Sequence, residues 1–144
     1  MRINAMSRVS LGLLLLLSTP IQAQQTDLRL VNAVRHSNRA TVRVLLQEQI
    51  DVNIRQPDGA TALHWAAYLD DLETADLLLG AGALPDVTNE LGVTPLYLAC
   101  DNGNAALVQQ LLAAGATPHA VLPSGETALM TAARTGSVEA VTTL

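Results

Sequence analysis

The chain has 144 residues, 49% of them hydrophobic, 2% aromatic and none phenylalanine, and its formal net charge is −5 at pH 7. An acidic surface repels polyanions, so this balance argues against nucleic acid as the main partner. So few aromatic side chains leave little bulky filling for one central core, whereas abundant alanine and leucine suit a stack of thin layers.

Residues 1–23 have the pattern of a secretory signal peptide. Arg2 and Arg8 precede a short apolar run at residues 11–17, after which come Pro20 as a breaker and Ala23 as a small residue at the cleavage site. The run is shorter than the roughly 20 residues of a membrane-spanning helix. We therefore expect export from a bacterial cell, to the periplasm or the medium, with no membrane insertion after cleavage. An uncleaved N-terminal anchor is the alternative.

Residues 24–57 are expected to form a divergent, capping first unit. Leu30 and Ala33 lie in register with Leu63 and Ala66 of the next unit, and Asn38 is a good N-cap for a second helix. The Gly-x-Thr turn that opens the later units is missing.

Three further units follow at a spacing of 33 residues, and we expect them over residues 58–90, 91–123 and 124–144. Each opens with a glycine, which supplies a turn with positive φ, and then a threonine, whose hydroxyl can cap a helix. The pairs are Gly59 and Thr61, Gly92 and Thr94, and Gly125 and Thr127. Pro95 fits the first helical position, where no N–H is needed. A fixed period of this length predicts stacked supersecondary units that cannot bury their apolar faces alone.

A second helix is predicted in every unit. Its N-caps recur at the same spacing, at Asn38, Asp71, Asn104 and Ser137. An apolar i, i+3, i+4 stripe follows each cap, which is typical of a helix buried along one side. Gly82 and Gly115 then fall where a left-handed residue would end the helix. The last unit stops inside this helix at Leu144, so we expect that the sequence is a fragment of a longer repeat protein.

These motifs resemble the ankyrin repeat over about residues 26–144. Thr61-Ala62-Leu63-His64 and Thr94-Pro95-Leu96-Tyr97 are near matches to the Thr-Pro-Leu-His turn of that family. The resemblance implies an all-α solenoid of stacked helix-turn-helix units with β-turn fingers, the last unit being incomplete. Tyr97 and Met130 replace the histidine, and Asp70 stands where Gly103 marks the corner between helices. Asp tolerates that backbone region better than most residues do.

No catalytic, cofactor-binding or metal-binding residue is predicted. The resemblance implies that His64 hydrogen-bonds locally and steadies the turn between fingers, with a catalytic base or metal ligand as the alternative. The three histidines, at positions 36, 64 and 119, share no ligand-like spacing. Cys100 is the only cysteine and aligns with Ala67 on the packed face of the first helix, so we expect it to be a small buried side chain. Trp65 is assigned to packing, with an indole N–H that can reach a polar group.

The resemblance also implies a concave face for partners, built from the finger tips and the ends of the first helices. The predicted contact residues are Asp58, Tyr68, Leu69, Glu90, Asp101, Asn102, Glu126 and Arg134, and further finger-tip positions are Ala60, Val93 and Ser124. Exposed Tyr68 and Leu69 suit an anchor for a partner, although Tyr68 can equally cover its own helix corner. The acidic tips can meet a basic peptide or protein patch.

Charge is unevenly spread along the chain. Five arginines lie between Arg29 and Arg55, whereas ten acids from Asp58 onward face only Arg134. One interpretation is that these charges are solvated faces that keep the stack soluble, and the other is that they orient a partner.

The predicted function is a non-enzymatic protein–protein interaction module, an ankyrin-repeat scaffold in an exported compartment. The alternative is the targeting arm of a longer enzyme or effector whose catalytic part lies beyond Leu144. A structural spacer is the third possibility, and finger-tip substitutions would then change no binding.

Overall fold

The computed structural model describes residues 27–144, so the predicted signal peptide lies outside the described residues. Within that range the chain forms eight α-helices, and the only β-type pairing is an isolated antiparallel bridge between Val121 and Thr127. The helices are α1 (Arg29–Arg35), α2 (Arg39–Gln47), α3 (Ala62–Tyr68), α4 (Leu72–Gly80), α5 (Pro95–Asp101), α6 (Ala105–Ala113), α7 (Ala128–Thr135) and α8 (Val138–Thr143).

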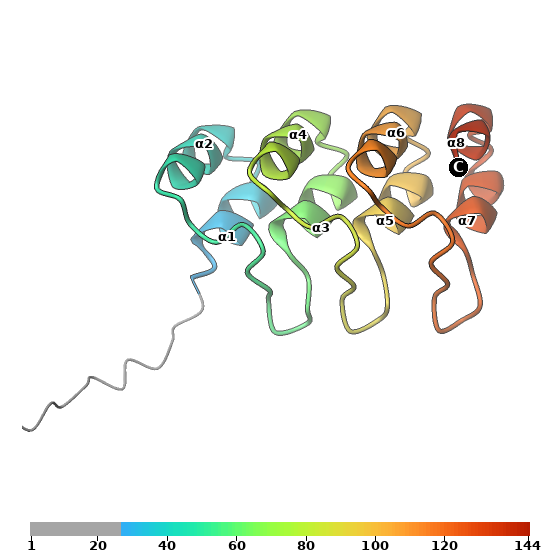
Figure 1. The fold of residues 1–144 in the computed structure, drawn as a ribbon, viewed down its shortest axis with the longest axis horizontal. Helices are drawn as coiled ribbons and strands as arrows, with labels where there is room; N and C mark the ends of the chain where they lie inside the picture. Colours follow the sequence, from blue (N-terminus) through green and yellow to red (C-terminus); the bar gives the residue numbers. More distant parts are fainter. Residues whose placement is uncertain (1–26) are drawn as a thin grey trace, which may run out of the picture.

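The helices stack in four successive pairs (Figure 1). The first helices of the pairs (α1, α3, α5 and α7) lie in one row and the second helices (α2, α4, α6 and α8) in another. The loops before α3, α5 and α7 project as fingers from the first row. The predicted all-α stack is therefore confirmed. None of the helices in residues 27–144 combines the length and the apolar character needed to cross a membrane.

Each finger is a tight turn closed by backbone hydrogen bonds. The Gly59 N–H donates to the Gln56 carbonyl at 2.8 Å, and the Gln56 N–H donates to the Ala60 carbonyl at 2.8 Å. Gly59 has a φ of +80°, as its turn requires, and the equivalent Gly92 has a φ of +76°. Neighbouring fingers also join, because the Glu90 N–H donates to the Asp58 carbonyl at 2.8 Å.

The predicted caps open the helices. The hydroxyls of Thr94 and Thr127 accept from the N–H three residues later, and Pro95 occupies the first turn of α5. The second helices begin in the same way, with Asn38, Asp71, Asn104 and Ser137 each accepting from the N–H three residues on.

The corners between paired helices all have left-handed backbone, as the register predicts. Asp70 has a φ of +58° where Gly103 has +68°. In the first unit Ser37, with a φ of +54°, holds the corner without glycine, and Gln49, with a φ of +56°, holds the position after the second helix that Gly82 occupies in the next unit. The predicted helix-ending glycine Gly82 has a φ of +90°.

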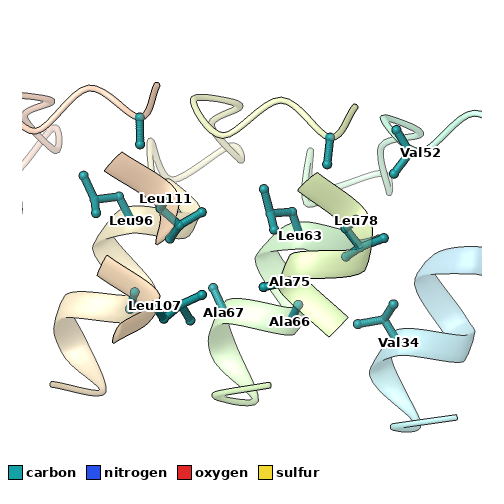
Figure 2. Close-up of a cluster of buried hydrophobic side chains, with 14 of the residues drawn as sticks. Val34, Val52, Leu63, Ala66, Ala67, Ala75, Leu78, Leu96, Leu107 and Leu111 are labelled. Atoms are coloured by element: carbon teal, nitrogen blue, oxygen red, sulfur yellow. The ribbon is translucent and has the colours of Figure 1, made fainter. Parts of the chain in front are cut away.

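One elongated apolar seam runs through the stack. Figure 2 shows Leu63 of α3 beside Leu78 of α4, and the same arrangement of Leu96 and Leu111 in the next unit. These leucines are at most 1% exposed, while fully buried alanines such as Ala66 keep neighbouring helices close together. The seam continues from unit to unit, so each layer shares its core with its neighbours.

Ion pairs between arginines of the first unit and acids of the second join these two units. Arg39 of α2 binds the Asp71 carboxylate at 2.8 Å, and Arg43 binds Glu73 of α4 at 2.6 Å. The Asp71 side chain is nearly buried and also accepts from the Thr74 hydroxyl at 2.7 Å. Burial would raise the pKa of Asp71, but these hydrogen bonds outweigh it and hold the pKa below its usual value. These two arginines of the first unit are thus paired with acids of the same chain.

Candidate binding surface

A hollow of about 240 Å³ is lined by residues of two neighbouring fingers and of the helices that follow them, in the second and third units. Its wall comes from the finger before α3, from α3 itself, from the next finger and from α5. The lining residues are Asp58, Ala60, His64, Trp65, Tyr68, Asn89 and Leu98. It is the hollow in which the predicted contact residues Asp58 and Tyr68 come together.

Two aromatic rings of α3 form the most distinctive part of this wall. Trp65 and Tyr68 pack edge to face, with ring centroids 5.7 Å apart and planes at 85°. The indole N–H of Trp65 donates to the Gln56 side chain at 2.6 Å, which fixes the ring against its own finger. Tyr68 is 60% exposed. The prediction that the Trp65 N–H reaches a polar group is confirmed, while Tyr68 both covers Trp65 and faces solvent.

Arg35 at the end of α1 reaches the same aromatic cluster. Its guanidinium carbon lies 5.1 Å from the centre of the Trp65 ring, a stacking geometry typical of cation–π contacts. Arg35 does not line the hollow. The first unit therefore supports Trp65 from the side without filling the space beside Tyr68.

His64 holds one finger to the next. Its Nδ1 accepts from the Thr61 N–H at 3.1 Å and the Thr61 hydroxyl at 2.9 Å, so Nε2 carries the proton and donates to the Val93 carbonyl at 3.0 Å. Burial lowers the pKa of His64, since the charged ring would lose its hydration. Both ring nitrogens of His64 are therefore engaged in hydrogen bonds within the stack, which agrees with the structural role that the resemblance implies.

Asp58 presents its carboxylate at the rim. The Ala60 N–H donates to it at 3.0 Å. In residues 27–144 no arginine lies within ion-pair distance of Asp58. The nearby Arg55 instead donates to the carbonyls of Gly59 and Thr88. Asp58 is thus a carboxylate without an ionic partner in the described part of the chain.

Two of the proposed finger-tip positions differ from the sequence interpretation. Ala60 is only 6% exposed and packs into its finger, so it is not a tip. Glu126 accepts from the Thr131 hydroxyl at 2.8 Å and the Tyr97 hydroxyl at 3.2 Å, and these bonds hold its pKa below the usual value. Tyr97 and Glu126 occupy the positions of His64 and Val93 one unit further along the stack. The Tyr97–Glu126 bond therefore corresponds to the bond between His64 and Val93. Glu126 is therefore a structural link as well as an acidic group.

Other predicted contact residues also have partners within the stack. Asp101 pairs with Arg134 at 2.8 Å, and the Asn102 side chain donates to the Ala67 carbonyl at 2.9 Å and the Tyr68 carbonyl at 3.3 Å. Each of these contacts crosses from one unit to the next. Their role toward a partner stays a prediction, as it does for Leu69 and for exposed Glu90.

Sequence reasoning missed one exposed finger residue. Leu91 is 72% exposed and occupies the register of Asp58 and Ser124, so the period itself could have found it. Trp65, assigned only to packing, is also part of the wall of the hollow.

A larger open hollow, of about 690 Å³, lies between α4 and α6 on the row of second helices. Its two acids already have partners, because Glu73 binds Arg43 and Asp76 accepts from the Gln110 amide at 2.8 Å. The hollow beside Tyr68 is the better candidate, since it combines exposed aromatic surface with a free carboxylate.

Two further features of the described residues bear on chemistry, the Cys100 thiol and the arrangement of metal-ligating side chains. Cys100 is fully buried, and burial raises its pKa to about 11, so a reactive thiolate is disfavoured at neutral pH. In residues 27–144 no three histidine, cysteine or acidic side chains cluster in a way that could hold a metal ion.

Comparison with known proteins places these features in a family. A family model described as "Ankyrin repeats (3 copies)" matches residues 10–89 and residues 69–144. The chain is 34% identical over 84 residues to neurogenic locus notch homolog protein 1 of Xenopus tropicalis, a match that covers 57% of this chain and 3% of that protein. It is 38% identical over 80 residues to human NF-kappa-B inhibitor alpha, covering 53% of this chain and 25% of the relative.

Enzymes also contain similar segments. Palmitoyltransferase Hip14 of Drosophila melanogaster is 32% identical over 92 residues, which is 63% of this chain and 14% of that protein. The chain thus spans a quarter or less of the length of each of these relatives. The similarity covers their repeats and not the whole proteins.

Proposed function

This chain belongs to the ankyrin repeat family, and on that premise we propose that it is a non-enzymatic protein-binding module that works outside the bacterial cytoplasm. The observation that supports this best is the exposed Tyr68, set beside an open hollow that two neighbouring fingers and the helices after them line. Exposed aromatic side chains on rigid supports are typical centres of protein interfaces.

Preorganisation of the face supports the proposal. The hydrogen bond between Glu90 and Asp58 joins two fingers, and Asn102 binds the carbonyl of Tyr68 from the next unit. A partner that docks on this face orders few additional groups, so little of its binding free energy is lost to conformational entropy.

The relatives support binding rather than catalysis. The name of human NF-kappa-B inhibitor alpha describes action on another protein, and the match lies in repeats of the same kind. The match to palmitoyltransferase Hip14 covers 14% of that enzyme and involves the repeats alone, so we propose no transferase activity for this chain.

We infer export from the pattern of residues 1–23. The family match begins at residue 10, inside this segment, so export is tested directly. The full chain, fused at its C-terminus to alkaline phosphatase and expressed in a Gram-negative host, should give periplasmic phosphatase activity, and mass spectrometry should find a mature form that begins near Gln24. Phosphatase activity that is absent while the fusion accumulates in the cytoplasm would refute export.

Binding can be tested at single-residue resolution. A photo-crosslinking amino acid at position 68 should give a protein adduct in cells, whereas the same group at position 139, on exposed Glu139 of α8, should not. Tyr68→Ala combined with Glu90→Ala should reduce recovery of the same partner, identified by mass spectrometry, by about tenfold or more. Circular dichroism should show an unchanged fold, because both side chains are exposed. Unchanged recovery with both substitutions would contradict the proposed face.

A further inference from the structure

We propose that the hollow beside Tyr68 binds a cationic side chain of the partner, with arginine preferred to lysine. This inference rests on the proposed function and adds the chemistry of the group that the face recognises.

Size limits the ligand to one side chain. Pockets for small molecules usually measure about 300–1,000 Å³, and this hollow has about 240 Å³. Its opening toward solvent lets an extended backbone pass over it while one side chain enters. The apolar lining from Ala60 and Leu98 suits the aliphatic stem of a long cationic side chain.

Trp65 of the aromatic wall already contacts the guanidinium group of Arg35, which lies outside the hollow. Arg35 stacks on Trp65 at 5.1 Å, which shows that this ring accepts a planar cation in the folded protein. Tyr68 is set edge to face against Trp65 and keeps 60% of its surface exposed. A second guanidinium can therefore stack on Tyr68 without displacing Arg35, which does not line the hollow.

The carboxylates at the rim favour a cation, because the nearby Arg55 is bound to backbone carbonyls and forms no ion pair with these carboxylates in residues 27–144. Asp58 has no ion-pair partner in residues 27–144, and the exposed Glu90 follows on the adjacent finger, whose backbone bonds directly to that of Asp58. Arg134, the only basic residue after Asp58 apart from the histidines, is already bound to Asp101. The planar guanidinium of arginine can stack flat on a ring while it donates two N–H groups to a carboxylate, whereas a lysine ammonium is a compact point charge without a planar surface.

Trp65 makes a direct test possible, because it is the only tryptophan of the chain and lies in the wall. The probe is a blocked alanine–glycine pentapeptide with a central arginine, compared with the same peptide carrying citrulline, its neutral isostere. Titration at millimolar concentration should change Trp65 fluorescence saturably with the arginine peptide, and the citrulline peptide should bind about three- to tenfold more weakly. A lysine peptide should fall between the two.

Asp58→Asn should abolish the preference for arginine over citrulline. The matched control is Glu139→Gln, which removes one negative charge from a remote, exposed site on α8 and should keep the preference. Tyr68→Leu should weaken the arginine peptide more than the citrulline peptide. Equal binding of arginine and citrulline, or an undiminished preference in Asp58→Asn, would overturn the inference.

The two proposals can fail separately. If the cross-linker at position 68 captures a partner but no cationic peptide changes Trp65 fluorescence, the protein-binding face stands and the cation site is wrong. If the arginine peptide binds through Asp58 but no partner is captured at position 68, the cation site stands and the protein-binding function is wrong.

Discussion

At the scale of single residues, His64 shows how a buried polar side chain joins units and makes stability depend on pH. The ring is 3% exposed, and its donated hydrogen bond to Val93 requires the proton on Nε2. Burial lowers its pKa in the folded state, whereas an unfolded chain protonates histidine near pH 6.5. The unfolded state therefore binds the proton first as the pH falls.

The sign of the effect follows from linkage. The contribution of His64 to the free energy of unfolding is fully present above about pH 6.5 and decreases as the pH falls from there through the lower folded-state pKa. Urea unfolding monitored by circular dichroism should give a lower midpoint at pH 5.5 than at pH 7.5. His64→Gln, which keeps a donor and an acceptor but cannot titrate, should be less stable at pH 7.5 and lose part of this pH dependence. An identical pH dependence in both proteins would show that His64 does not cause it.

The substitution of tyrosine for histidine in the next unit marks the limit of sequence reasoning at this scale. The motif register identified Tyr97 as a departure, but not the Glu126 carboxylate that binds its hydroxyl at 3.2 Å. These residues lie 29 positions apart, and only the stacking of one unit on the next brings them together. The same holds for Arg39 and Asp71, whose charges the sequence assigned to solvent or to a partner.

At the scale of elements, local chemistry made the helices predictable. Each cap, such as Asn104, bonds to an N–H only three residues away, and the corner at Asp70 needs only a residue that tolerates left-handed backbone. Such features depend on only a few consecutive residues, so the repeat pattern of the sequence was enough to predict them. The hollow was not predictable in this way, because its wall combines two fingers with α3 and α5.

The fingers lead to a prediction that separates backbone strain from packing. Gly92 and Gly125 occupy the same turn with similar φ values, +76° and +85°. A Cβ at Gly92 would lie 2.8 Å from Cδ of Pro123 in the next finger, whereas a Cβ at Gly125 would have no neighbour within 4 Å. Gly125→Ala should therefore lower the free energy of unfolding by about 1 kcal/mol through backbone strain alone. Gly92→Ala should cost about 1–3 kcal/mol more, because the rigid proline ring must move.

Urea unfolding of the two variants, followed by circular dichroism, measures this difference directly. The comparison is internally controlled, since both substitutions add the same methyl group to the same type of turn. Equal losses of stability would mean that the fingers do not pack on one another as the structure shows.

At the scale of the whole molecule, position in the stack decides what a side chain contributes. Leu63, Leu96 and Leu129 occupy one register of the first helices. Leu96 of α5 is 1% exposed because α3 and α7 flank its helix, whereas Leu129 of α7 is 47% exposed. Within residues 27–144, the pair α7 and α8 has a neighbouring pair on one side only. Leu30, in the same register of α1, is 1% exposed, and its helix packs on α3 of the following unit. The burial of this leucine therefore depends on the unit that follows it in the stack.

The same substitution at these two sites should therefore have different consequences. Leu96→Ala should lower the free energy of unfolding by about 2–5 kcal/mol, since it opens a cavity in the shared seam. Leu129→Ala should cost about 1 kcal/mol or less, because much of its surface already contacts water. Since no layer stands alone, Leu96→Ala should also shift the unfolding of the second unit, reported by Trp65 fluorescence, together with the loss of helical circular dichroism. A Trp65 transition that stays in place while the helical signal shifts would show that the units unfold independently, and the shared seam would then not be what holds the binding face rigid.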